Sequence, residues 1–350
     1  PTMIRMLEDL TGLHAQEIPL DDKTVMSLFK NTSALGVTPE ELNGCPMGTL
    51  GIPEFGTDFA MGMLRDAKPQ EFTDLIRISG LSHGTDVWLG NAQTLIENGT
   101  ATISTCICTR DDIMTYLIHM GLDSAEAFDI MEKTRKGIIA KGKCKQWPEW
   151  KQDMLDHGVP EWYTWSCEKI KYMFPKAHAA AYVMMAWRIA YCKVFYPLAY
   201  YAAFFSIRAT SFSYELMCQG KDKLEFYIAE YKKKDKLSAK EEGTLRDMRI
   251  VQEMYARGFE FLPLDLYKSD ARYFQIVDGK LLPPFNSIDG MGDKAAESLA
   301  IAASGGKFLS KDDLRERGKV SKSIIELLSD LDIISDLPES NQLSFFDFTA

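Results

Sequence analysis

Apolar residues recur at helical spacing along most of the first 210 residues, and short polar or glycine-containing breaks separate the runs. Thr109 followed by Asp112 has the form of a capping box, and Asn98-Gly99 is a typical helix end. Residues 138–150 lack a period and predict a loop. The pattern predicts an all-helical region, with helices at about 86–97, from Thr109 to about Gly121, from Ser124 to about Gly137, from Pro160, from Pro175 to Pro197, and at 198–209.

The pattern changes after residue 210. Residues 215–257 are strongly charged and helical, whereas 273–277 and 280–282 flank Asp278-Gly279 as the strands of a two-residue hairpin do. The predicted fold class is therefore mainly α, with a small α+β region near the carboxyl end. The predicted divisions are a helical domain at 1–210, a charged helical connector at 211–258, the α+β region at 259–336 and a flexible tail at 337–350.

Composition places the chain among ordinary globular proteins. Its 350 residues are 46% hydrophobic and 26% charged, which suffices for two domains with separate cores. The seven cysteines form no C-x-x-C pair and match no standard zinc spacing, so we expect free thiols in a reducing cytoplasm. The most apolar stretch, 182–207, contains Arg188, Lys193 and Pro197, which argues against a membrane span. The chain opens on Pro1 without a visible signal peptide, and we expect a piece of a longer protein.

The net charge is −10, yet two stretches of the chain are basic. From Ser166 to Lys193 five Lys or Arg stand against one acid, and from Gly305 to Ser323 six stand against three. Binding to nucleic acid depends on clustered positive charge more than on net charge. Each patch is therefore a candidate phosphate-binding surface, with a solvated charged face as the alternative.

The stretch Lys171-Tyr-Met-Phe-Pro-Lys-Ala-His-Ala-Ala-Ala-Tyr182 carries most of the candidate chemistry. Pro175 suits the first position of a helix, which places Lys176 beside the free N–H groups that bind phosphate at helix starts. His178 and Tyr182 share one helix face, and the alanines between them leave space for a ligand. The pattern predicts a site for a phosphorylated ligand; an ordinary buried helix with a hydrogen-bonded histidine is the alternative.

Two further motifs lie nearer the carboxyl end. Ile288-Asp-Gly-Met-Gly292 before Asp293-Lys-Ala-Ala296 has the form of a helix-hairpin-helix turn, in which glycines allow close approach and the next helix start binds a phosphate. A plain glycine turn before a helix is the alternative. Gln342-Leu-Ser-Phe-Phe346 places apolar side chains on the tail and predicts a docking peptide; a tail folded onto its own core is the alternative.

The Lys171–Tyr182 stretch closely resembles the nucleotide-binding helix of the fingers domain in C-family bacterial replicative DNA polymerases, above all the Gram-positive PolC type of DNA polymerase III alpha subunit. The likeness extends through Gly158–Tyr163, Gly80–Trp88 and Gly48–Gly56 and downstream to the last residues, so it covers nearly the whole chain. It implies an all-helical fingers domain at 1–210, a duplex-binding region with a helix-hairpin-helix at 259–336 and a clamp-binding tail at 337–350.

The resemblance also implies roles for individual residues. An incoming dNTP would be contacted by Arg110, Lys176, His178, Tyr182 and Phe174, and by Ser79, Ser82 and His83 from a glycine-flanked loop. Duplex DNA would be held by Gly290, Gly292, Asp293, Lys294, Lys307 and Lys311. The sliding clamp (beta) would be bound by Gln342, Leu343, Ser344, Phe345 and Phe346, with Phe345 in place of the usual leucine. Alternatives stay open for three of these: Arg110 pairs with a neighbouring acid, the loop is a simple turn, and Phe174 is buried beside the helix.

Polymerase chemistry needs two metal ions held by carboxylates, and the sequence offers no such set, since Asp330-Leu-Asp332 lies at a predicted helix end. In the family the catalytic aspartates belong to a palm domain before the fingers. The ligands of Mg²⁺ are thus expected outside this chain, and the chain alone is expected to be inactive. As part of a DNA-directed DNA polymerase, its partners would be primer–template DNA, dNTP, the clamp and other replisome subunits, and no membrane. The alternatives are a non-catalytic DNA-binding scaffold that recruits the clamp, and a folded but inactive polymerase remnant.

Overall fold

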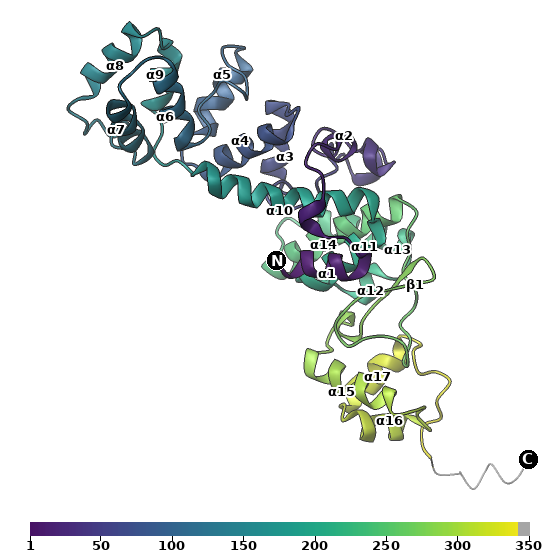
Figure 1. Cartoon of the computed structure of the whole chain (residues 1–350). Helices are drawn as coiled ribbons and strands as arrows, with labels where there is room; N and C mark the ends of the chain where they lie inside the picture. Colours follow the sequence, from purple (N-terminus) through teal and green to yellow (C-terminus); the bar gives the residue numbers. More distant parts are fainter. Residues whose placement is uncertain (342–350) are drawn as a thin grey trace, which may run out of the picture. The chain divides into compact units, whose positions relative to one another are not determined.

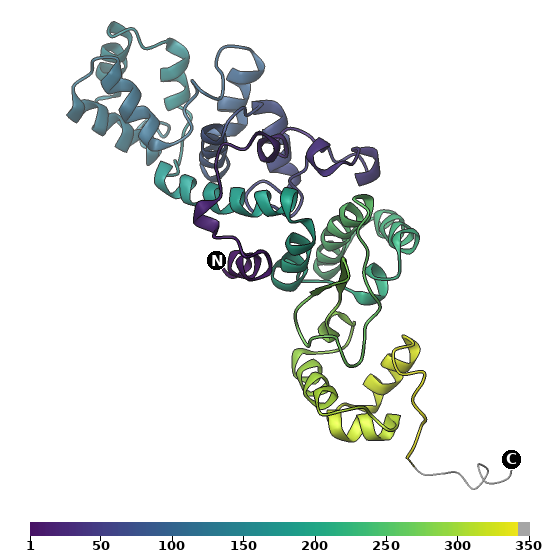
Figure 2. The ribbon, with the colours of Figure 1, turned by 45° about the vertical axis from the view of Figure 1, so that its right-hand side comes forward.

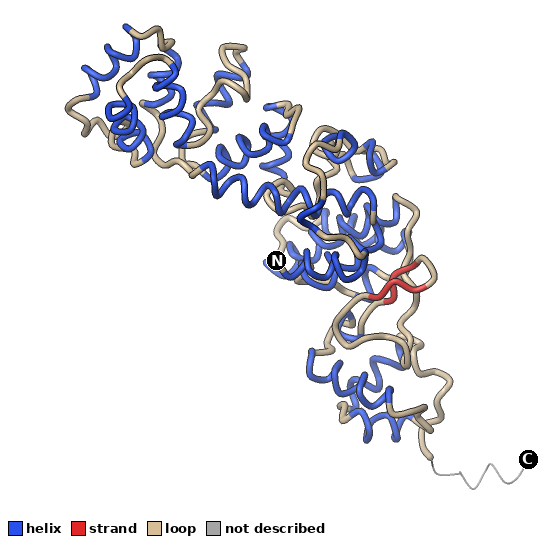
Figure 3. The backbone as a smooth tube through the Cα atoms, viewed as in Figure 1, coloured by secondary structure: helices blue, strands red, loops and turns tan. Residues whose placement is uncertain are grey.

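Helices dominate the computed structural model, which describes residues 1–341 (Figure 1, Figure 3). The mainly α fold predicted from the sequence is confirmed, and within these residues the named strands form one short antiparallel hairpin. In the same part of the chain, no helix is both long and apolar enough to cross a membrane.

Contacts divide the chain into two compact units. The central unit contains Ala15–Pro39 and Cys45–Val194, and the terminal unit contains Pro1–His14, Glu40–Gly44 and the chain from Phe195 onward. The chain passes from the central to the terminal unit for the last time after Val194, at the end of α10. The domain limits proposed above at residues 210, 258 and 336 stay predictions about functional regions.

The central unit is built almost entirely of helices. Its α-helices are α2 (Lys23–Ser27), α3 (Asp58–Ala67), α4 (Phe72–His83), α5 (Gln93–Glu97), α6 (Arg110–His119), α7 (Ser124–Arg135), α8 (Trp147–Asp156), α9 (Glu161–Cys167) and α10 (Lys176–Phe195). The predicted starts of α6, α7 and α9 are confirmed. Two predictions are wrong: a π-helical turn at Trp88–Ala92 replaces the first half of the expected helix at 86–97, and α8 begins inside the predicted loop at 138–150. Leu89 and Gly90 leave the helical conformation in that turn, which explains the first error.

Helix α10 organises the centre of this unit. Its buried face repeats at helical spacing through Ala179, Val183, Ala186 and Ala190, and the neighbouring Trp187 is also buried. The Trp187 ring stacks on Phe29 with centroids 5.9 Å apart, and burying a side chain of this size stabilises the fold by about 3 kcal/mol.

Lys193, near the end of α10, is fully buried and fixes a distant loop. Its ammonium donates hydrogen bonds of 2.7 Å to the carbonyls of both Gly48 and Leu50. The same loop inserts Ile52 and Phe55 into the core. Residues 48–56 are therefore held from both sides, by apolar packing and by a buried cation.

The terminal unit contains α1 and a run of carboxyl-terminal elements. These are α1 (Thr2–Thr11), α11 (Pro197–Ala203), a π-helical turn (Phe204–Arg208), α12 (Tyr214–Met217), α13 (Lys221–Lys232), α14 (Ala239–Ala256), β1 (Gln275–Val277), β2 (Lys280–Leu282), α15 (Asp293–Ser304), α16 (Lys311–Gly318) and α17 (Lys322–Asp330). The predicted hairpin is confirmed: Val277 pairs with Lys280, and Asp278 and Gly279 both have positive φ, as a type I′ turn requires.

Helices α15, α16 and α17 lie together (Figure 2). Their buried residues share one hydrophobic core with Tyr214 of α12 and with apolar residues from 264–291. Leu299, Leu314 and Leu328, one from each helix, are fully buried in it.

On α14, Asp247 is buried and accepts an N–H hydrogen bond of 2.8 Å from Ser211, and burial raises its pKa to about 6.

Candidate functional site

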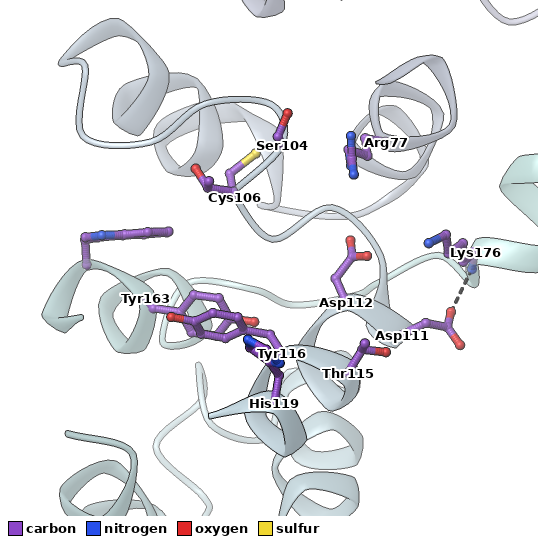
Figure 4. A pocket seen from close by; sticks show the side chains of 12 residues that line it. Arg77, Ser104, Cys106, Asp111, Asp112, Thr115, Tyr116, His119, Tyr163 and Lys176 are labelled. Carbon is purple, nitrogen blue, oxygen red and sulfur yellow. Dashed lines mark hydrogen bonds between the residues drawn. The ribbon is translucent and has the colours of Figure 1, made fainter. Parts of the chain in front are cut away.

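The starts of α6 and α10 lie against each other in the central unit. The backbone N–H of Arg110 donates to the Phe174 carbonyl at 3.4 Å, and the backbone N–H of Lys176 donates to Asp111 Oδ2 at 2.8 Å (Figure 4). α10 begins at Lys176, one residue later than predicted. The first residues of two helices therefore present one cation each to the same region.

Residues 108–112 fix the start of α6. The Asp112 carboxylate accepts the N–H groups of Cys108 at 3.2 Å and Thr109 at 2.8 Å, which confirms its part in the predicted capping box. Gly80 of α4 packs so closely here that a Cβ would stand 2.6 Å from Thr109 Cγ2 and 2.9 Å from the Cys108 carbonyl. Only a glycine at position 80 lets α4 lie this close to Cys108 and Thr109, the two residues that precede Arg110.

The side-chain cations of Arg110 and Lys176 have no ion pair or hydrogen bond within residues 1–341. The alternative in which Arg110 pairs with a neighbouring acid is therefore not realised, since Asp111 and Asp112 both bind backbone N–H groups. Two unpaired cations beside helix starts suit an anionic ligand.

Four rings form an aromatic group beside these cations. The Phe174 centroid is 4.7 Å from that of His83, 5.9 Å from that of His178 and 6.2 Å from that of Tyr182. His178 and Tyr182 are exposed, and His83 and Phe174 are partly so. The structure therefore brings together four residues that the sequence analysis proposed, and their rings suit a planar group. Phe174 keeps part of its surface accessible, so the alternative of full burial is not realised.

The predicted glycine-flanked loop with Ser79, Ser82 and His83 is wrong as local structure, because all three lie on α4. His83 ends that helix, and its Nδ1 lies 2.7 Å from the Ser79 carbonyl. Ser79 itself is buried with its hydroxyl unpartnered, so it lies inside the protein rather than on the surface of the site. A bridge between Thr85 and Tyr172 joins the end of α4 to the segment before α10.

A pocket of about 510 Å³ adjoins Lys176 (Figure 4). Sequence reasoning missed most of its walls, because the lining residues come from four separate segments: Arg77, Ser104, Thr105, Cys106, Asp111, Asp112, Thr115, Tyr116, His119, Trp162 and Tyr163. Burial raises the pKa of Tyr163 well above its usual range and also raises that of Tyr116. Both phenols are therefore neutral at physiological pH. The pocket combines aromatic walls with charged groups at one side.

The start of α15 in the terminal unit carries the predicted helix-hairpin-helix turn. Gly290 has φ 88°, a conformation that favours glycine, and Gly292 precedes the first helical residue, Asp293. Lys294 and Lys307 are exposed and have no ion pair within the described residues. Lys311 differs, because its ammonium lies 2.6 Å from Glu339 Oε1 and is largely buried.

Two further expectations concern the sliding clamp and the metal ions. The clamp-binding segment, Gln342–Phe346, lies outside the described residues. Within residues 1–341, no three His, Cys, Asp or Glu side chains are grouped as a metal site would need.

Comparison with known proteins gives two family matches. Residues 1–158 match the model of the bacterial DNA polymerase III alpha subunit finger domain, and residues 258–343 match the helix-hairpin-helix motif. The chain is 52% identical over 347 residues to the PolC-type DNA polymerase III of Caldanaerobacter subterraneus subsp. tengcongensis. Over nearly its whole length the chain is therefore similar to PolC-type DNA polymerase III proteins. Similar relatives include the PolC-type enzymes of Streptococcus sanguinis, 51% identical over 350 residues, and Bacillus cereus, 52% identical over 347 residues.

These relatives are longer proteins. Each match covers 99% of this chain but only 24% of the relative, so the chain spans about a quarter of their length. The family resemblance found in the sequence is therefore confirmed. The finger-domain match ends at residue 158, before α9 and α10, whereas the relatives match across both helices.

Proposed function

We propose that this chain supplies the nucleotide-binding and duplex-binding surfaces of a replicative DNA-directed DNA polymerase. The observation that carries the proposal is the meeting of Arg110 and Lys176 at two adjacent helix starts, beside the exposed rings of His178 and Tyr182. A nucleoside triphosphate has the matching chemistry, with a polyanion at one end and a planar base at the other.

In the reaction of such a polymerase, a primer 3′-hydroxyl attacks the α-phosphate of a dNTP. Lys176 and Arg110 would neutralise the charge of the triphosphate, and the aromatic group around Phe174 would orient the base or the templating pair. Among residues 1–341 no group of His, Cys, Asp or Glu side chains fits a metal site, so no step through Mg²⁺ is assigned to them. The carboxylates for those ions, and catalytic competence, would lie elsewhere in the polymerase.

The binding test compares a dNTP, the matching dNMP and the nucleoside, using a PolC-type polymerase that carries this chain in place of its own segment. Lys176→Ala and Arg110→Ala should each weaken dNTP binding tenfold or more, because one lost charged contact costs on the order of 1.5–3 kcal/mol. Nucleoside binding should change little. Lys171→Ala is the matched control, because Lys171 lies in the same segment but is paired with Asp86 at 2.8 Å.

Equal losses for Lys176→Ala and Lys171→Ala would remove Lys176 from the site. If dNTP binding proves insensitive to both Lys176 and Arg110 while DNA binding persists, the non-catalytic scaffold becomes the better account.

Duplex DNA is the second proposed ligand. The exposed Lys294 lies in the first turn of α15, and the exposed Lys307 follows the end of that helix. The start of α15 offers backbone N–H groups to a phosphate next to Gly290 and Gly292. Replacing both lysines with Gln should lower affinity for duplexes of any sequence and reduce the salt dependence by about two phosphate contacts. Lys311→Gln should have a smaller effect, because Glu339 already neutralises that charge. An unchanged salt slope in the double variant would exclude this surface.

Clamp docking is the third part of the proposal and rests on the sequence Gln342–Phe346 alone. Deleting these five residues should abolish binding to a sliding clamp and leave extension of short primers intact. Equal clamp affinity before and after deletion would refute this assignment.

A further inference from the structure

His83 is held by hydrogen-bond acceptors at both ring nitrogens. Its Nδ1 lies 2.7 Å from the Ser79 carbonyl, and its Nε2 lies 2.9 Å from the Glu54 carboxylate. Ser82 Oγ also lies 3.0 Å from Nδ1, but this hydroxyl is placed to donate to the Ser79 carbonyl at 2.9 Å. A carbonyl and a carboxylate both need a donor, and a neutral imidazole has only one N–H. Both contacts are satisfied together only by the imidazolium form of His83.

Glu54 is placed for this contact by an uncommon backbone conformation. Its φ of 72° lies in the left-handed region, where a non-glycine residue is strained. The surroundings impose this conformation: Ile52 and Phe55 on either side are buried, and Lys193 holds the same loop through two carbonyls. A sparsely populated conformation kept by rigid surroundings points to a use for the side chain that it orients.

The pairing determines what His83 can offer to a ligand. Both N–H groups are already engaged, so the ring has no donor left for a phosphate. Its faces remain, and they lie near Phe174 at 4.7 Å and Tyr182 at 6.1 Å, with about a third of the side chain exposed. A cationic ring among aromatic rings suits an electron-rich planar group, which in a nucleotide is the base.

We propose that Glu54 is a positioning residue that keeps His83 as an imidazolium at the nucleotide site, so that His83 recognises the base end of the ligand and not the phosphates. This inference rests on the proposed nucleotide binding. It adds Glu54, which has no assigned role in that site, and it separates His83 from the phosphate-binding cations Arg110 and Lys176.

The charge state of His83 is measured directly by side-chain ¹⁵N NMR on this chain with labelled histidine. The chain has five histidines, and the His83 signal is the one that disappears in His83→Asn. At pH 7.5 both nitrogens of His83 should show the shifts of protonated nitrogen. Glu54→Gly removes the carboxylate at a φ that glycine adopts freely, so the loop should keep its fold, and His83 should become neutral with its proton on Nδ1.

Asp153→Asn is the matched control, because Asp153 Oδ1 makes the same kind of contact with His157 at 3.2 Å. This variant should leave the His83 signals unchanged. A neutral His83 in the unmodified chain at pH 7.5, or an imidazolium that persists in Glu54→Gly, would overturn the proposal.

The functional arm measures dNTP affinity at two pH values in a PolC-type polymerase carrying this chain. Glu54→Gly should weaken binding about fivefold at pH 7.5 and less than about twofold at pH 6.0, because a lower pH favours a charged imidazole whether or not a carboxylate is present. A merely structural role for Glu54 would give the same loss at both pH values and would refute positioning through charge. Lys176→Ala separates the proposed nucleotide site from the role of Glu54 within it. If Lys176→Ala leaves dNTP affinity unchanged, the nucleotide site itself is misplaced. If Lys176→Ala weakens binding strongly while Glu54→Gly has no effect, only the role of Glu54 is rejected.

Discussion

Asp111 occupies the place where a phosphate is proposed to bind, and replacing it tests that overlap. Its carboxylate accepts the Lys176 N–H at 2.8 Å, so in the free protein it neutralises the start of α10. Asp111→Asn keeps an oxygen that can accept this hydrogen bond and removes the negative charge. A triphosphate at the start of α10 would then no longer be repelled by it.

The size of the effect follows from Coulomb's law. A carboxylate and a phosphate oxygen about 5 Å apart repel by about 1 kcal/mol at the high effective dielectric of an exposed position such as that of Asp111. Asp111→Asn should therefore bind a dNTP about fivefold more tightly, with little change for the nucleoside. Asp111→Ala should gain less, because it also removes the acceptor that caps α10.

The assay is an equilibrium titration at low and high salt, and the gain should shrink as salt screens the repulsion. Asp123→Asn is the control, since Asp123 caps α7 in a similar way through the N–H groups of Ala125 and Glu126. Weaker or unchanged dNTP binding in Asp111→Asn would show that the triphosphate does not approach the start of α10.

Three further predictions concern stability. Lys193→Met should destabilise the central unit by about 2–5 kcal/mol in a denaturant titration, because it removes the buried ammonium that donates to the carbonyls of Gly48 and Leu50. A loss under about 0.5 kcal/mol would contradict this. Gly80→Ala should lower the unfolding free energy by about 1–3 kcal/mol, because the added methyl group would clash with the Cys108 carbonyl. Gly62→Ala on α3, where a Cβ meets open space, should raise the unfolding free energy by up to about 1 kcal/mol. Changes of the same sign in both variants would refute the packing argument. Asp247 has a folded-state pKa raised to about 6, so its contribution to stability is present at low pH and is lost as pH rises from about 4 to about 6. The unfolding free energy of Asp247→Asn, measured by thermal unfolding, should therefore rise relative to that of the unmodified chain by on the order of 2–3 kcal/mol between pH 4.5 and 7.5. A difference between the two proteins that does not change with pH would contradict this prediction.

The sequence predicted helix starts and turns well where the residues that decide them lie close together along the chain. Capping chemistry located the start of α6, and Pro175 located the start of α10 to within one residue. Asp278-Gly279 predicted the hairpin, because that turn needs two residues with positive φ. In each case the deciding contacts lie within a few residues along the chain, which is the range that spacing and propensity can cover.

The site was only partly predictable because its other contacts join distant segments. Asp111 meets the Lys176 N–H across 65 positions, and Lys193 reaches the Gly48 carbonyl across 145. In the sequence Lys193 interrupts an apolar run and adds to the basic stretch that ends with it, whereas in the structure it is fully buried and cannot contribute to a phosphate-binding surface. Glu54 lies in the stretch Gly48–Gly56 that carries part of the resemblance, but nothing in that stretch indicates its contact with His83, which depends on a strained φ and on the path of the loop.

The most direct test of the account is a structure of a PolC-type polymerase carrying this chain, bound to primer–template DNA and an incoming dNTP. The account predicts phosphate oxygens within hydrogen-bonding distance, about 3 Å, of the Lys176 ammonium, and the base or the templating pair against the rings around Phe174. A triphosphate bound elsewhere, with the start of α10 facing away from it, would contradict the central claim.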